Sequence, residues 1–120
     1  MANEPTPPTP PTEKPPAGHV WACMRDGNAL QRRAARVGHF AVVVYGRRQH
    51  CEYYITHVPT GMLVPVACDT RKQAIAAARE LEAHSPASMH ALPWGGDVRT
   101  LPRADLRACV DALAHAKAAG

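Results

Sequence analysis

Three segments rich in β-branched and aromatic residues constrain the fold of this chain more than any other feature. They are His39–Tyr45, His50–His57 and Met62–Ala67. Such side chains favour strands. Short turns, Gly46–Gln49 and Val58–Gly61, separate the segments, and strands joined by short turns pair antiparallel. We therefore expect a three-stranded antiparallel meander.

Pro65 places a further condition on this sheet. It lies inside the third segment, and proline has no backbone N–H to donate to a neighbouring strand. The third strand should therefore lie at an edge of the sheet, or turn this position outward.

Helices are expected before and after the meander along the chain. Asn28 is a good N-cap for a helix over Ala29–Arg36, a run of strong helix formers without a breaker. A second helix, capped by Asp69 or Thr70, should run from Arg71 to about His84. The predicted class is α+β, in α-β-β-β-α order with an additional C-terminal helix.

The two ends of the predicted domain allow alternatives. His19–Met24 is either a strand or a segment that packs Trp21 onto the core. The C-terminal helix should begin at Thr100 to Pro102 and end near Lys117, and its apolar face either closes the core or forms a homodimer. The sequence does not separate these possibilities.

A proline-rich segment precedes the domain. Proline fixes φ and removes a hydrogen-bond donor, so we predict a disordered or extended tail over residues 1–18 and a single domain over residues 19–120. The P-x-x-P spacings suit an SH3-like partner, or the tail is a spacer. No apolar run is long enough to cross a membrane, and the N-terminus does not resemble a secretion signal. The four cysteines include no C-x-x-C pair, which favours free thiols and a cytoplasmic location.

Arginines are concentrated between His19 and Thr60, in a chain of net charge +4. Guanidinium groups bind phosphates and carboxylates through a planar fork of donors. We therefore expect this part of the chain to contact nucleic acid or an acidic protein surface, with an aromatic ring adding stacking contacts. The candidate binding residues here are Arg32, Arg33, Arg36, Arg47, Arg48 and Tyr54.

The histidines and cysteines do not form a recognisable catalytic or metal motif. Cys51 and His57 fall on one predicted strand but roughly 20 Å apart, too far for a nucleophile and its base. His57 is better explained as a structural histidine at a turn. The His50, Cys51, His19, Cys23, Cys109 and His115 spacings match no known ligand set. We predict no catalytic residues, no metal, no cofactor and no enzymatic activity.

The segment Thr70-Arg71-Lys72-Gln73-Ala74, followed by Ala77-Ala78 and Leu81, resembles the last helix of the double-stranded RNA-binding domain. The expected helix–three strands–helix order is also similar to that family. The resemblance implies that Arg71 and Lys72 contact phosphates at a helix N-terminus, where the helix dipole also favours anions.

The segment Tyr54-Ile55-Thr56-His57-Val58-Pro59-Thr60-Gly61, followed by a strand and the Thr70–Ala74 helix start, resembles small accessory proteins of phages and plasmids. Inhibitors of host defence, including anti-CRISPR proteins, are among them. The resemblance implies a non-enzymatic protein that occupies a surface on a host protein or ribonucleoprotein complex. The alternative is a module that binds double-stranded nucleic acid directly.

Overall fold

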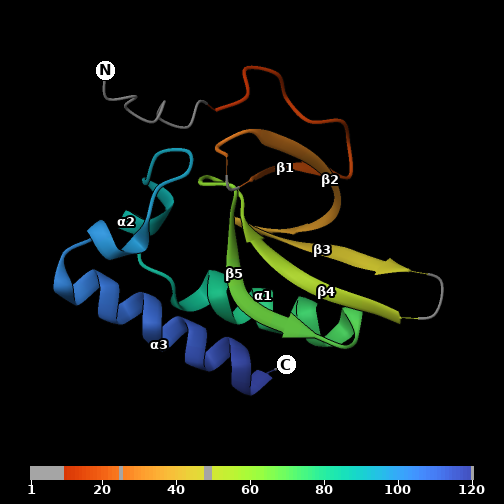
Figure 1. The fold of residues 1–120 in the computed structure, drawn as a ribbon. Coiled ribbons are helices and arrows are strands. Elements are labelled where there is room, and N and C mark those ends of the chain that lie inside the picture. The colour runs from red at the N-terminus through yellow and green to blue at the C-terminus, as the bar shows by residue number, and fades with distance from the viewer. Residues whose placement is uncertain (1–9, 25, 48–49, 120) are drawn as a thin grey trace.

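The computed structural model describes residues 10–24, 26–47 and 50–119, in which five strands precede the helices (Figure 1). The strands are β1 (His19–Cys23), β2 (Ala29–Val37), β3 (Phe40–Arg47), β4 (His50–His57) and β5 (Met62–Cys68). The helices are α1 (Arg71–His84), the short α2 (Ala87–His90), the 3₁₀ turn η1 (Val98–Thr100) and α3 (Arg103–Ala119).

The strands form one antiparallel sheet in the order β1-β2-β3-β4-β5, so each strand pairs with its neighbours along the chain. The three predicted strands are present as β3, β4 and β5. The prediction of a three-stranded meander in α-β-β-β-α order is wrong, because two further strands come first and no helix precedes them in the described residues. Pro65 lies on β5, which is an edge strand as expected.

The main difference from the predicted fold lies at Ala29–Arg36, which we predicted as a helix and which belongs to strand β2. This segment pairs with β1 on one side and with β3 on the other. Glycines with positive φ, Gly27 (84°) and Gly38 (60°), make tight reversals at its two ends. Helix propensity is worth only tenths of a kcal/mol per residue, so tertiary contacts routinely outweigh it. Pairing on both sides therefore overrides the local preference.

The sheet curls until β1 returns to the β4–β5 turn. The Cys23 N–H donates to the Gly61 carbonyl at 2.7 Å. Gly61 has φ of 70°, and a Cβ there would lie 2.4 Å from the ring of Trp94, so the indole packs directly on this turn. The curl encloses a small second core of Val20, Ala41 and Val43 on the sheet face opposite the helices.

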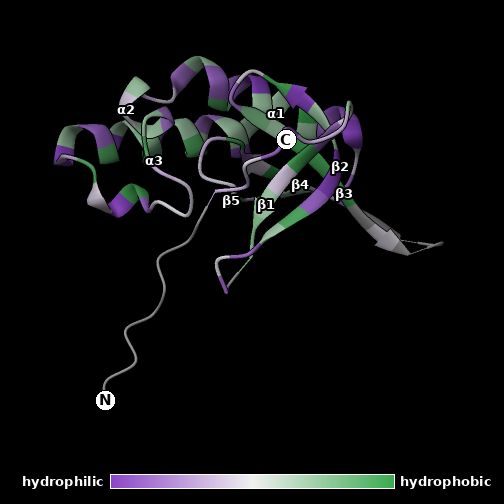
Figure 2. Cartoon of the chain, turned by 90° about the horizontal axis from the view of Figure 1, so that it is seen from above, coloured by the Kyte–Doolittle hydropathy of each residue, from purple (hydrophilic) through white to green (hydrophobic). Residues whose placement is uncertain are grey.

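The helices cover the other face of the sheet and enclose the main core (Figure 2). Thr70 caps α1 through a reciprocal pair of hydrogen bonds with Gln73, which confirms one of the two predicted caps. α3 lies along α1, and its Ala112 and Ala116 are fully buried. Such small side chains let the two helices approach closely. α3 therefore closes the core, which is one of the two roles considered for the last helix.

The remaining predictions concern the N-terminal segment, the cysteines and membrane insertion. Residues 10–18 contain no helix or strand, and Trp21 Nε1 donates to the Glu13 carbonyl at 3.0 Å. The first half of the predicted proline-rich tail, residues 1–9, lies outside the described residues. Cys23, Cys68 and Cys109 are free thiols. None of the helices in the described ranges is long and apolar enough to cross a bilayer.

Candidate functional site

The strand conformation of β2 divides the arginines that we expected on one helix. Side chains alternate along a strand, so Arg32 and Arg36 share one face of the sheet and Arg33 lies on the other. Arg36 Nε donates to the Gly38 carbonyl at 2.8 Å. Arg47 is the last residue of β3, while its side chain and all of Arg48 lie outside the described part of the chain. Arg32 and Arg33, which we expected on one helix, therefore lie on opposite faces of the sheet.

Arg33 instead lies near the start of α1. Arg33 and Arg71 line one hollow of about 380 Å³, together with Tyr53 of β4. Arg71 also lines a neighbouring hollow along α1, together with Lys72 and Arg79. We call Arg33, Arg71, Lys72 and Arg79 the basic surface. The structure thus brings together three residues predicted from the sequence, Arg33, Arg71 and Lys72, and adds Arg79.

The electrostatics of the basic surface are unbalanced. Within the described ranges, none of its four side chains pairs with a carboxylate. The first turn of α1 contains no acidic residue, although the positive end of the helix dipole favours one there. Two cations, Arg71 and Lys72, occupy that turn instead. The arrangement concentrates positive charge and presents it to solvent.

Tyr54, the predicted stacking residue, lies away from this surface. It is directly opposite Val43 on β3, on the sheet face that carries the second core, and its hydroxyl donates to Glu52. Tyr53 takes the position beside Arg33 and Arg71. A one-residue difference on a strand reverses the face, so the sequence could identify a tyrosine here only once the register was known.

A second cluster joins four polar residues that sequence reasoning did not connect. Glu82 of α1 accepts hydrogen bonds from the backbone N–H of His39 at 2.9 Å and from its Nδ1, also at 2.9 Å. The rings of His39 and His90 stack at 3.8 Å with 5° between their planes. His90 Nδ1 lies 3.0 Å from Nε2 of His57. The chain from Glu82 to His57 links the helices to the end of β4.

His57 is the buried end of this histidine chain, with 1% of its surface exposed. Its Nδ1 lies 2.8 Å from Oγ1 of Thr60, whose hydroxyl donates to the His57 carbonyl and accepts from the Met62 N–H. Burial, followed by the neighbouring His90 and His39, lowers the pKa of His57 to about 4. A neutral His57 therefore has a hydrogen-bond partner at each ring nitrogen, Thr60 at Nδ1 and His90 at Nε2.

The pKa values of Glu82 and His90 also depart from their ordinary range. Burial raises the pKa of Glu82, but the hydrogen bonds from the His39 backbone and side chain outweigh it, and the net pKa is lowered. Burial and the nearby His39 lower the pKa of His90. At neutral pH the cluster thus holds a carboxylate next to a neutral His90.

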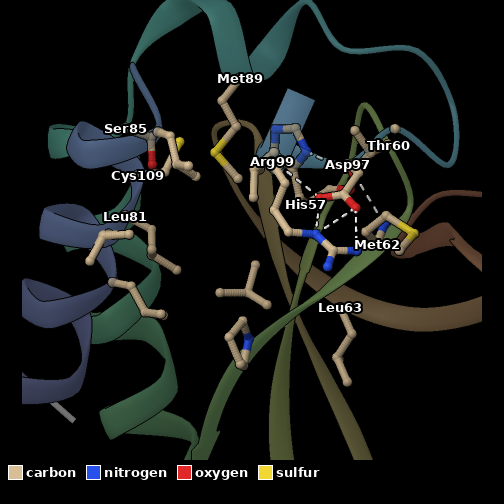
Figure 3. Close-up of a pocket in the computed structure, with 17 residues that line it drawn as sticks. His57, Thr60, Met62, Leu63, Leu81, Ser85, Met89, Asp97, Arg99 and Cys109 are labelled. Carbon is tan, nitrogen blue, oxygen red and sulfur yellow. Dashed lines mark hydrogen bonds and ion pairs between the residues drawn. The ribbon is translucent and has the colours of Figure 1, made fainter. Parts of the chain in front are cut away.

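An apolar groove of about 320 Å³ lies between β5 and the helices (Figure 3). Leu81, Met89 and Cys109 line its helical side, and Leu63, of which 57% is exposed, lies on the β5 side. His57 and Thr60 border the same groove. Their polar atoms are satisfied by each other and by His90, which removes the usual cost of placing polar groups beside an apolar surface.

Comparisons with known proteins give no match to a protein-family model, a curated protein or a solved structure.

Proposed function

We propose that this protein is a non-enzymatic binding protein of a mobile element. It acts by docking on an acidic surface of a host nucleic-acid-handling complex, such as a defence complex, and modulating or inhibiting that complex. One observation carries the proposal: Arg33 and Arg71 reach one hollow from two different elements, with Tyr53 beside them, and neither pairs with a carboxylate of the described chain.

The charge arrangement supports binding of an anionic partner because it is unfavourable in the isolated protein. Arg71 and Lys72 at the N-terminal turn of α1 oppose the helix dipole, each by a few tenths of a kcal/mol or more. Carboxylates of a partner would offset this cost on binding. Arginine is also the side chain best suited to hold a carboxylate with two parallel hydrogen bonds.

A protein partner fits these observations better than a duplex. The resemblance to the double-stranded RNA-binding domain included a helix–three strands–helix order, and the segment expected as its first helix is strand β2. The basic surface, as far as the described residues show it, offers a phosphate backbone a short stretch of α1 and one position of β2. The proposal places the protein in the cytoplasm, where such a complex would work.

The test compares two charge reversals of equal size. Arg33→Glu/Arg71→Glu reverses the charge of two of the four residues of the basic surface, and Arg103→Glu/Arg107→Glu makes the same change in net charge at exposed positions of α3. All four residues are exposed, so we expect both variants to fold, which thermal denaturation checks. Each tagged protein is incubated with nuclease-treated host lysate, and the retained proteins are identified.

We expect one complex to be retained by the wild-type protein and by the α3 control, and its affinity to fall at least about tenfold, or 1.4 kcal/mol, in Arg33→Glu/Arg71→Glu. Equal retention by both variants would refute the proposal. So would tight binding of the purified protein to a duplex RNA or DNA with a steep dependence on salt, because the partner would then be nucleic acid itself.

A further inference from the structure

Three potential metal ligands meet where the β2–β3 turn, α1 and α2 come together. His39, Glu82 and His90 each offer one ligand atom, and these atoms all lie within 4.8 Å of one another. The residues come from separate parts of the chain, so their proximity is a product of the fold. The cluster is distinct from the basic surface of the proposed function.

The surrounding hydrogen bonds orient two of these ligands. His90 Nδ1 lies 3.0 Å from His57 Nε2, and when it donates a hydrogen bond there, the Nε2 of His90 keeps its lone pair. A histidine ligand typically donates its other ring N–H to a neighbouring group in this way, which fixes the tautomer and the ring orientation. His57 and Thr60 are buried, so this support is rigid.

Glu82 and His39 can hold one ion between them. A Glu82 oxygen lies 2.9 Å from His39 Nδ1, whereas a tetrahedral Zn²⁺ holds nitrogen and oxygen ligands about 2.1 Å from itself and thus about 3.3 Å apart. A small outward shift of His39, whose side chain is 46% exposed, makes up the difference. The His39 proton then moves from Nδ1 to Nε2, and the ring stays neutral. The rings of His39 and His90 stack with 5° between their planes, so their in-plane lone pairs run parallel, and coordination of one ion by both requires the exposed His39 ring to turn out of the stack.

We propose that His39, Glu82 and His90 bind a divalent transition-metal ion of the zinc class. Two imidazoles and one carboxylate are a ligand set that zinc accepts, and it leaves a fourth position for water or another ligand. Gly38 supports the assignment, because a Cβ at this position would lie 2.3 Å from the Glu82 carboxyl carbon. The turn before β3 therefore leaves room for this carboxylate next to His39.

A second group on the protein surface supplies the control. Glu80, His84 and His115 also lie within ligand distance of one another, and the rings of His84 and His115 stack at 4.1 Å. Both histidines are exposed, and among the described residues no buried side chain contacts them as His57 contacts His90. This group should bind an ion more weakly.

The test measures Zn²⁺ binding to the chelator-treated full chain by calorimetry and by competition with a chromophoric chelator. We expect one ion per chain and a rise in Tm on addition of Zn²⁺. The affinity should fall at least about tenfold in Glu82→Gln and His90→Ala, and it should be unchanged in His115→Ala. Circular dichroism of each metal-free variant confirms that it folds.

A measurement on the wild-type protein keeps the test independent of variant stability. Zn²⁺ should shift the imidazole ¹⁵N resonances of His39 and His90 more than those of His84 and His115. Absence of stoichiometric binding would overturn the proposal. Loss of binding in His115→Ala with full binding in His90→Ala, or shifts confined to His84 and His115, would also overturn it by placing the ion between α1 and α3.

Discussion

Replacement of Gly38 by alanine tests the contact between the β2–β3 turn and α1. Gly38 has φ of 60°, where a residue with a Cβ is strained by about 1 kcal/mol. The added Cβ would also lie 2.3 Å from the carboxyl carbon of Glu82 and 2.5 and 2.7 Å from its two oxygens. The carboxylate must therefore move.

Movement of the carboxylate breaks its hydrogen bonds to His39. The backbone N–H and Nδ1 of His39 both donate to Glu82, and a bond to a charged group contributes about 1.5–3 kcal/mol when it is buried. The Glu82 side chain is 33% exposed, so water replaces part of this, and we assign about 1–2 kcal/mol to the pair of bonds. The total cost of Gly38→Ala is then about 2–3 kcal/mol.

A double-mutant cycle separates the two contributions. In the Glu82→Ala background the collision is absent, so Gly38→Ala should cost only the backbone strain of about 1 kcal/mol. The assay is urea denaturation of all four proteins in a chelating buffer, followed by circular dichroism, with equal m-values as the check on two-state unfolding. The loss of unfolding free energy caused by Gly38→Ala is compared between the wild-type and Glu82→Ala backgrounds. If the two losses agree within about 0.5 kcal/mol, the contact between Gly38 and Glu82 is refuted.

Two further predictions concern the core and the histidine chain. Leu81, only 2% exposed, should lose about 2–5 kcal/mol of stability when replaced by alanine, whereas Val110→Ala, at a position 57% exposed, should stay within about 0.5 kcal/mol; equal costs in thermal denaturation would place Leu81 outside the core. Burial, with His90 and His39, lowers the pKa of His57 to about 4, so between pH 6.5 and about 4 the unfolded chain binds a proton that the folded protein excludes. The unfolding free energy of the metal-free protein should fall over this interval by up to about 3 kcal/mol, and a His57→Gln variant that keeps the full pH dependence would contradict the assignment.

The sequence predicted the second half of the fold because its signals there are local. β-branched and aromatic runs between turns define β3, β4 and β5, and Pro65 indicates the sheet edge on which β5 lies. The capping residues define the start of α1, and Pro86 follows close after its end. In each case the neighbours along the chain are sufficient, so propensity and pattern agree with the final structure.

The error at β2 shows where local reasoning fails. Ala29–Arg36 contains good helix formers, and only the strands on its two sides make it a strand. Turn residues lie at both ends of this segment, Asp26-Gly27 before it and Gly38 after it. Such residues are typical of hairpins, and they favour a strand over a helix between them. The error had a functional consequence, because it grouped arginines that a strand distributes over two faces.

For the candidate sites too, the chemistry of the residues is visible in the sequence, whereas their placement depends on the tertiary structure. The expectation that Arg33, Arg71 and Lys72 contact an anionic partner rests on their chemistry, which is visible in the sequence alone. Only the tertiary structure placed Arg33 beside Arg71, since they lie on different elements. It alone also assembled His39, Glu82 and His90, because the curl of the sheet and the packing of α1 and α2 bring together residues that no short-range pattern connects.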